Sequence, residues 1–124
     1  MPYTATDKVD LIFRAFADRT RLRILALLRE RQEICVCELM QVLNLPQAKV
    51  SRHLAYLRKA GLVAGRKDQQ WMHYRLLPPK GQFHAKLLEC LACCFCEVAA
   101  LKADRKRLPT CCGPESSGGG KCCD

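Results

Sequence analysis

Several features that would assign this chain of 124 residues to other functional classes are missing from it. No apolar run is long enough to cross a bilayer, and the first residues lack the charged start and apolar middle of a signal peptide. We find no combination of nucleophile, base and acid, and no glycine-rich loop suited to holding phosphate. We therefore expect a cytoplasmic protein that does not bind membranes and is not an enzyme.

Histidine is scarce, and its three residues do not have the spacing of a zinc site. We expect His53 to pack or to touch phosphate, His73 to lie on a β-hairpin, and His84 to be structural. Cysteine, by contrast, occurs ten times. In a reducing compartment these thiols are available to metals or to redox chemistry, whereas a secreted protein would use them as a disulfide framework.

Acidic residues are few between positions 45 and 76. This segment contains a single acid, Asp68, against seven basic residues: Lys49, Arg52, Arg58, Lys59, Arg66, Lys67 and Arg75. The whole chain has a net charge of +9, so most of its excess lies in about a quarter of its length. A basic segment of this kind favours an anionic partner, with nucleic acid as the leading candidate.

The spacing of apolar residues predicts five helices and one β-hairpin. The helices are expected at residues 7–17, 21–31, 37–43, 46–60 and 82–105, and the strands of the hairpin at 62–66 and 71–76. Thr20 is the expected cap of the second helix, and Pro46 suits the first turn of the fourth.

The chain divides into an expected domain at residues 1–108 and a tail at residues 109–124. The tail is rich in Gly, Ser and Cys and has little to pack, so we expect it to be flexible. The last helix of the domain is unusually apolar between Leu87 and Leu101. In a domain of this size, a partner subunit is the simplest cover for such a surface.

The fourth helix has a buried stripe at Val50, Leu54 and Leu57, and polar or basic side chains project from its opposite side. Such side chains bond to base edges and phosphates. The predicted DNA contacts are Gln47, Lys49, Ser51, Arg52, Tyr56 and Lys59 on this helix, and Arg66, Lys67 and Gln69 near the tip of the hairpin. On this helix alone, a merely solvated basic face remains the alternative.

Cys35 and Cys37 lie at the start of the third helix, where the helix N-terminus lowers the pKa of a thiol. Residues i and i+2 on an intact helix point apart. We therefore expect a shared soft ion to unwind or tilt this end of the helix, and the fourth helix to move with it through the turn at residues 44–46. The alternative is a pair of small, half-buried side chains.

The remaining cysteines are secondary candidates. Cys93 and Cys96 are spaced i, i+3 on the last helix and suit a second thiolate site or an extra ligand. We expect Cys90 and Cys94 on the same helix to pack in an interface. In the tail, Cys111 and Cys112, like Cys122 and Cys123, are vicinal pairs that suit a large soft ion or are incidental thiols.

Four motifs resemble one family, the ArsR/SmtB metal-sensing repressors. They are the segment ADRTRLRIL at 17–25, where Arg19 replaces the usual proline, the metal box CVCEL at 35–39 of the arsenic-responsive branch, the recognition helix at 50–63 and the wing at 66–76. The match covers residues 8–105. The resemblance implies a mainly α-helical winged helix-turn-helix with a β-hairpin wing, dimerised through the first and last helices.

The resemblance also implies a repressor that releases a near-palindromic operator when a metal binds. Arsenite, As(III), is the implied inducer, with Cys35 and Cys37 as its primary ligands. The best-known arsenic sensors have a third cysteine where this chain has Met40, which we expect to pack in the core. The third ligand therefore stays open, with the last helix and the tail as candidates.

Other functions fit the same residues. The scaffold is also suited to sensing Cd, Pb, Sb(III) or methylarsenite, and a site with two thiolates favours methylarsenite. A thiol redox sensor would join the same cysteines in a disulfide instead of binding a metal. Finally, the cysteine-rich C-terminal end is compatible with a metal-buffering protein.

Overall fold

The computed structural model describes the backbone of residues 5–108 and the side chains of residues 9–91 and 98–108. The predicted mainly helical fold with a hairpin is confirmed. Its elements are α1 Ala5–Phe16, α2 Arg19–Glu30, β1 Ile34–Cys35, α3 Val36–Leu43, α4 Gln47–Lys59, β2 Val63–Asp68, β3 Trp71–Leu76, α5 Gln82–Glu97 and α6 Ala99–Arg107. Within the described residues, no helix is both long and apolar enough to cross a membrane.

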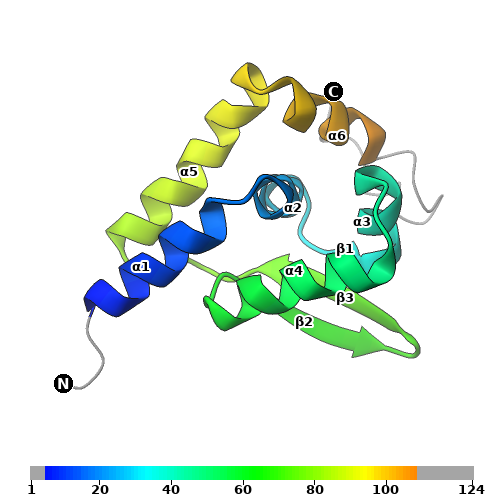
Figure 1. Cartoon of the computed structure of the whole chain (residues 1–124), viewed down its shortest axis with the longest axis horizontal. Helices are drawn as coiled ribbons and strands as arrows, with labels where there is room; N and C mark the ends of the chain where they lie inside the picture. The colour runs from blue at the N-terminus through cyan, green and yellow to red at the C-terminus, as the bar shows by residue number, and fades with distance from the viewer. Residues whose placement is uncertain (1–4, 109–124) are drawn as a thin grey trace.

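Helix α2 lies at the centre of the fold, with the other helices around it (Figure 1). Its residues from Ile24 to Leu28 are all buried. The expected stripe of α4, namely Val50, Leu54 and Leu57, is fully buried in the same core. Each such side chain contributes roughly 1.5–3 kcal/mol when it leaves water, so this stripe fixes α4 against α2 and leaves the opposite face of α4 exposed.

Two helix starts differ from those predicted. The carboxylate of Asp18 accepts the N–H of Arg21 at 3.0 Å, so Asp18, not Thr20, caps α2. Asp is the better cap because its charged oxygen also favours the positive end of the helix. Pro46 precedes α4 as its cap residue, and the helix itself begins at Gln47. Between α3 and α4, Asn44 adopts the left-handed conformation (φ 59°) that ends α3.

The wing belongs to a three-stranded antiparallel sheet with the order β1-β3-β2. The first strand was not predicted: Ile34 and Cys35 pair with Tyr74 and His73. The hairpin is also longer than predicted, because β2 continues to Asp68 and residues 69–70 alone make the turn. The predicted loop at residues 67–70 is therefore wrong. Polar residues in an exposed hairpin have the composition of a loop, so the sequence alone did not distinguish the end of β2 from the turn.

The predicted last helix is broken. Val98 is extended (φ −109°, ψ 111°) and separates α5 from α6, which turns back over α2 (Figure 1). Two contacts explain the turn. Asp104, which is 1% exposed, accepts two bonds of 2.8 Å from Arg23, and Leu101 is buried with Ala26 of α2. Leu101 therefore packs within its own chain.

Candidate functional site

Cys35 and Cys37 lie with their Sγ atoms 3.1 Å apart. The expectation that they point apart is wrong, because Cys35 is not part of the helix. It ends β1 with extended backbone (φ −76°, ψ 147°) and caps α3, and its sulfur accepts the N–H of Cys37 at 3.4 Å. The two sulfurs are therefore close enough to bind one ion, since metal–thiolate bonds measure about 2.3 Å for zinc.

A buried ion pair that the sequence analysis missed holds this corner in place. One carboxylate oxygen of Glu38 accepts the backbone N–H of Cys35 at 3.0 Å. The other carboxylate oxygen accepts N–H groups from both terminal nitrogens of Arg31, at 3.0 and 3.2 Å. The signal was present in the sequence, because Cys35-x-x-Glu38 has the spacing of a capping box, with Cys in the place of Ser or Thr.

Burial raises the pKa of the Cys35 thiol to about 11, and the hydrogen bond with Cys37 acts in the same direction. The lowered pKa expected at a helix N-terminus is therefore wrong for Cys35. Its side chain lies in the core, where removal of water disfavours the thiolate more than the helix end stabilises it. At neutral pH Cys35 is a thiol.

Among the described residues, no three His, Cys, Asp or Glu side chains come together as a metal site requires. Met40 is half-buried and packs against the core, as predicted. Cys90 is exposed on α5 in the single chain. The side chains of Cys93, Cys94 and Cys96, and the whole of the tail with Cys111, Cys112, Cys122 and Cys123, lie outside the described residues.

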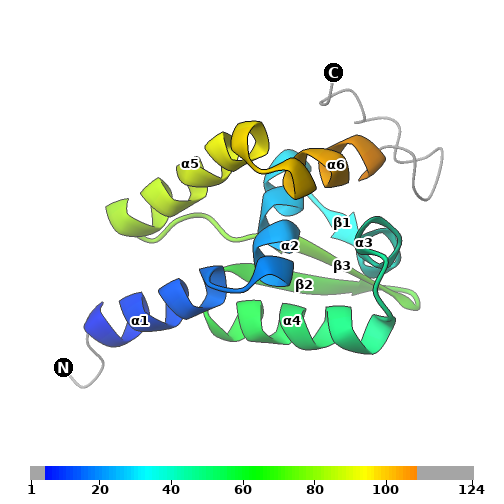
Figure 2. The ribbon, with the colours of Figure 1, turned by 45° about the horizontal axis from the view of Figure 1, so that its top comes forward.

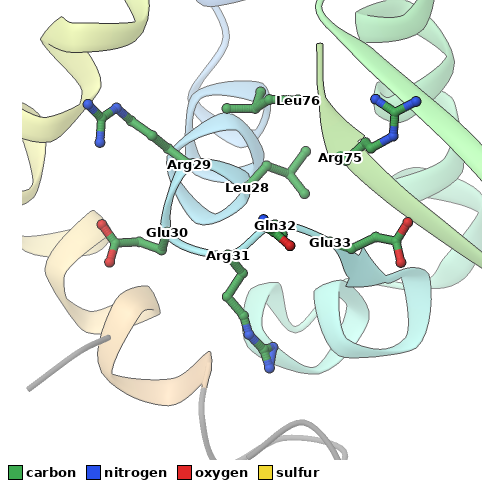
Figure 3. Close-up of a pocket in the computed structure, with 8 residues that line it drawn as sticks. All are labelled: Leu28, Arg29, Glu30, Arg31, Gln32, Glu33, Arg75 and Leu76. Carbon is green, nitrogen blue, oxygen red and sulfur yellow. The ribbon is translucent and has the colours of Figure 1, made fainter. Parts of the chain in front are cut away.

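Two hollows lie near this corner. The first, of about 450 Å³, opens beside the thiol pair and is lined by Cys37, Met40, Gln41, Asn44, Leu45 and Pro46. The second, of about 640 Å³, lies between the end of α2 and β3 and has no sulfur in its lining (Figure 3). Three of the charged residues around the second hollow bond to residues outside it: Glu30 to Arg105, Arg31 to Glu38 and Glu33 to Arg66.

Helix α4 and the hairpin lie along the same side of the molecule (Figure 2). Most of the predicted DNA contacts are exposed there: Gln47, Lys49, Ser51, Arg52 and Lys59 on α4, and Arg66, Lys67 and Gln69 on the hairpin. Arg66 is engaged within the chain, because its guanidinium donates two bonds of 2.8 Å to Glu33. Glu33 lies just before β1, so this ion pair joins the wing to the segment that carries the thiol pair.

Tyr56 and His53 of α4 are half-buried against Arg21 of α2. The Arg21 guanidinium lies over the Tyr56 ring, 3.9 Å from its centroid, and one of its nitrogens is 3.4 Å from His53 Nδ1. Burial lowers the pKa of His53, and the Asp18 carboxylate 3.8 Å away opposes this shift. These contacts hold α4 in position on α2, so both side chains have a packing role.

His84 is buried at the start of α5, where its Nδ1 accepts the N–H of Lys80 at 3.2 Å. This agrees with the structural role expected for it.

Comparison with known proteins decides the family. Residues 18–64, which include α2, the thiol pair and α4, match the family model described as "Bacterial regulatory protein, arsR family". Over 78 residues the chain is 47% identical to the arsenical resistance operon repressor of Escherichia coli, covering 63% of this chain and 67% of that protein. The chain belongs to the arsR family.

Two further comparisons agree with this arsR membership. The chain is 44% identical over 79 residues to the arsenic resistance transcriptional regulator ArsR1 of Pseudomonas putida, covering 64% of this chain and 62% of that one. It thus spans about two thirds of these curated relatives. The structure of HlyU from Vibrio cholerae superimposes with a TM-score of 0.65 at 34% identity, covering 78% of this chain and all of that chain. The arsR chain is therefore a winged-helix, DNA-binding transcriptional regulator and not an enzyme.

Proposed function

We propose that this arsR protein is a cytoplasmic, homodimeric repressor of metalloid-resistance genes. It leaves its operator when As(III), or a similar soft ion such as Sb(III) or Cd, binds Cys35 and Cys37. The observation that carries the proposal is the separation of 3.1 Å between the two sulfurs, at the start of the helix that leads into α4. The relatives named for arsenic resistance support the choice of ion.

The operator contacts are assigned to the exposed side of α4 and to the wing. Arg52 and Ser51 are the candidates for base edges, and the basic side chains of α4 and of the hairpin are the candidates for phosphates. Because phosphate contacts release counterions, operator binding should weaken steeply as salt increases.

Two connections join the thiol pair to the DNA-binding surface. The first is α3 itself, which leads through a three-residue turn to α4. The second crosses the sheet: Cys35 pairs with His73 on β3, and His73 pairs with Arg66 on β2. An ion that draws the two sulfurs onto itself changes the backbone at Cys35, and we infer that both α4 and the wing respond. The ion then has different contacts in the two states, as a switch requires.

Dimerisation is assigned to the first helix and to α5. Phe13 of α1 is 50% exposed although it packs on Phe83 of α5, with ring centroids 5.2 Å apart. Val98, directly after α5, is 41% exposed. Exposed apolar side chains of this size favour a partner surface.

The test is arsenite-induced release of operator DNA, followed by fluorescence anisotropy. We expect Cys35→Ser and Cys37→Ser to bind the operator and to lose the response. Cys93→Ser/Cys96→Ser and Cys111→Ser/Cys112→Ser make the same change of atom and test whether the last helix or the tail supplies a third ligand. A response retained by both single variants would move the sensor site away from α3.

The same sulfur distance favours a second candidate, a thiol redox sensor. Oxidation of Cys35 and Cys37 to a disulfide would shorten this distance to about 2.05 Å and remove two protons and two electrons. Release of the operator by peroxide, without release by arsenite, would select this candidate. Release by arsenite under reducing conditions would exclude it as the main function.

A further inference from the structure

The ion pair between Glu33 and Arg66 spans the sheet. Glu33 directly precedes β1, Arg66 lies on β2, and β3 runs between these two strands. We propose that Glu33 is a positioning residue for DNA binding, which holds the Arg66 guanidinium in place for a phosphate of the operator. The inference rests on the proposed function, because it assumes that the wing contacts the operator backbone. It gives a role in DNA binding to an acidic residue that does not itself bind DNA.

The geometry of the pair leaves part of the guanidinium available to DNA. Glu33 Oε2 accepts the Nε–H of Arg66, and Oε1 accepts an N–H of Nη2, both at 2.8 Å. These two bonds use one edge of the planar guanidinium, and Nη1 is not on that edge. The Asp68 carboxylate lies 4.0 Å from Nη1, which is beyond hydrogen-bond distance. The N–H groups of Nη1 can therefore donate to a phosphate while both bonds to Glu33 remain.

The carboxylate is the more covered partner of the pair. The side chain of Arg66 is 54% exposed, whereas that of Glu33 is 28% exposed. The cation is thus the group that the pair presents to solvent, and a DNA backbone that approaches the wing meets it in preference to the acid.

The backbone beside Glu33 is anchored in the core. Ile34 is fully buried and pairs with Tyr74 on β3. Strand β2, by contrast, is at the edge of the sheet, and its residues from Gly65 to Asp68 are exposed. An exposed hairpin of two strands is marginally stable by itself. The bonds from Glu33 therefore tie the exposed part of the wing to the folded domain and restrict the positions of Arg66.

Glu33 has two opposite effects on DNA binding. Immobilising one long side chain on binding weakens the affinity by about two- to tenfold, and Arg66 bears less of this cost because Glu33 already orders it. The charge of Glu33 also repels phosphates, which weakens binding. An experiment on Glu33 must therefore separate the loss of order from the loss of negative charge.

Asp68 provides the matched control. Glu33→Gln and Asp68→Asn each replace one carboxylate near the Arg66 guanidinium by its amide, so the change of charge is the same. Only Glu33→Gln removes a carboxylate that accepts two bonds from Arg66. In the reduced full-length protein without arsenite, we expect Glu33→Gln to bind the operator about two- to tenfold more weakly than Asp68→Asn, as measured by fluorescence anisotropy. Both variants should unfold in urea like the wild type, since an exposed ion pair contributes little to stability.

Arg66→Ala tests whether the effect of Glu33 passes through Arg66. This variant should bind the operator more weakly than wild type and should lower the slope of log affinity against log salt concentration by about 1, as the loss of one phosphate contact does. When Arg66→Ala is present, adding Glu33→Gln or Asp68→Asn should give equal affinities, because no guanidinium remains to be positioned.

Failure of the inference and failure of the proposed function give different results. If Glu33→Gln binds as tightly as Asp68→Asn, or more tightly, Glu33 only repels DNA and the inference is overturned, while the wing contact stands. If the difference between them persists in the presence of Arg66→Ala, Glu33 acts by another route and the inference is again overturned. If Arg66→Ala has the affinity and the salt dependence of wild type, the wing contact of the proposed function itself fails.

Discussion

At the scale of the residue, the backbone and side chain of Cys35 together have three roles. It ends β1, it caps α3, and it supplies one of the two close sulfurs. A ligand that takes this sulfur therefore competes with the cap and acts on the strand pairing at the same time. Substitution by Ser keeps an oxygen that can cap the helix, which is why Cys35→Ser is the informative change.

The raised pKa of Cys35 predicts how binding depends on pH. A divalent cation such as Cd²⁺ must displace the Cys35 proton into solution below pH 11, so this proton alone should lower the affinity by about tenfold for each pH unit lowered. An arsenic hydroxide carries the proton away as water, so its affinity should stay nearly constant between about pH 6 and about pH 8.

An indicator dye in weakly buffered solution measures the protons released by each ligand. Cys35→Ser, which has no proton to lose at this position, is the control for Cd²⁺. Proton release on arsenite binding, or an arsenite affinity that falls steeply with pH, would contradict the hydroxide exchange.

Arg52 tests the assignment of the DNA-binding face. Arg52→Ala should weaken operator binding without metal by about 1–3 kcal/mol if the side chain reads a base edge, and by less if it contacts phosphate. Lys102→Ala removes the same charge from exposed α6, away from the side of the molecule formed by α4 and the hairpin (Figure 2), and should change little. If Arg52→Ala and wild type bind the operator with equal affinity, measured by anisotropy at one salt concentration, this side of α4 is not the DNA-binding face.

At the scale of the element, periodicity predicted α1 to α4 well because each helix buries one stripe on the same core. It failed where contacts distant in sequence decide. Strand β1 has two residues, too few for a pattern, and its partner β3 lies far along the chain. The break at Val98 was invisible because apolar residues continue across it, and the Arg23–Asp104 pair that draws α6 back joins residues 81 positions apart. The converging sulfurs were missed for the same reason, since β1 sets the backbone of Cys35.

Glu38 predicts how strongly the start of α3 depends on its cap. Glu38→Ala removes the acceptor for the Cys35 N–H and leaves the mostly buried guanidinium of Arg31 without its partner, so it should destabilise the fold by on the order of 3 kcal/mol. Glu38→Gln keeps the acceptor and loses the charge, and should fall between Ala and wild type. Urea unfolding measures the stability. The arsenite concentration that releases half of the operator DNA measures the response of the thiol pair. A Gln variant as unstable as Ala would show that the ion pair, not the cap, dominates.

Tryptophan fluorescence can report on the second connection, which runs from Cys35 across the sheet to the wing. Trp71 is the single tryptophan of the sequence, and it lies on β3 two residues from His73, the partner of Cys35. Arsenite should change its emission with the same half-saturation as operator release, and Cys35→Ser should abolish the change. Unchanged emission together with normal release would leave α3 and its turn as the sole connection to the DNA.

At the scale of the whole molecule, one chain has one recognition helix, and a near-palindromic operator requires two in fixed register. The described residues include three large exposed apolar side chains: Phe13 on α1, Val98 directly after α5, and Trp71 on the wing. In the proposed dimer, the subunit contact sets the distance between the two α4 helices. We infer that a movement at each thiol pair would change this distance for both half-sites together.

Phe13→Glu tests this arrangement, because it places a charge in the expected subunit contact without touching α4 or the thiol pair. We expect sedimentation to show monomers and operator affinity to fall by at least about tenfold, since a monomer binds a single half-site. Trp71→Glu introduces the same charge at an equally exposed aromatic residue and should remain dimeric in the absence of DNA. If Phe13→Glu sediments as a dimer, the subunit contact lies elsewhere. If it is monomeric and still binds the full operator tightly, the half-sites are read independently and the coupling between the two subunits is excluded.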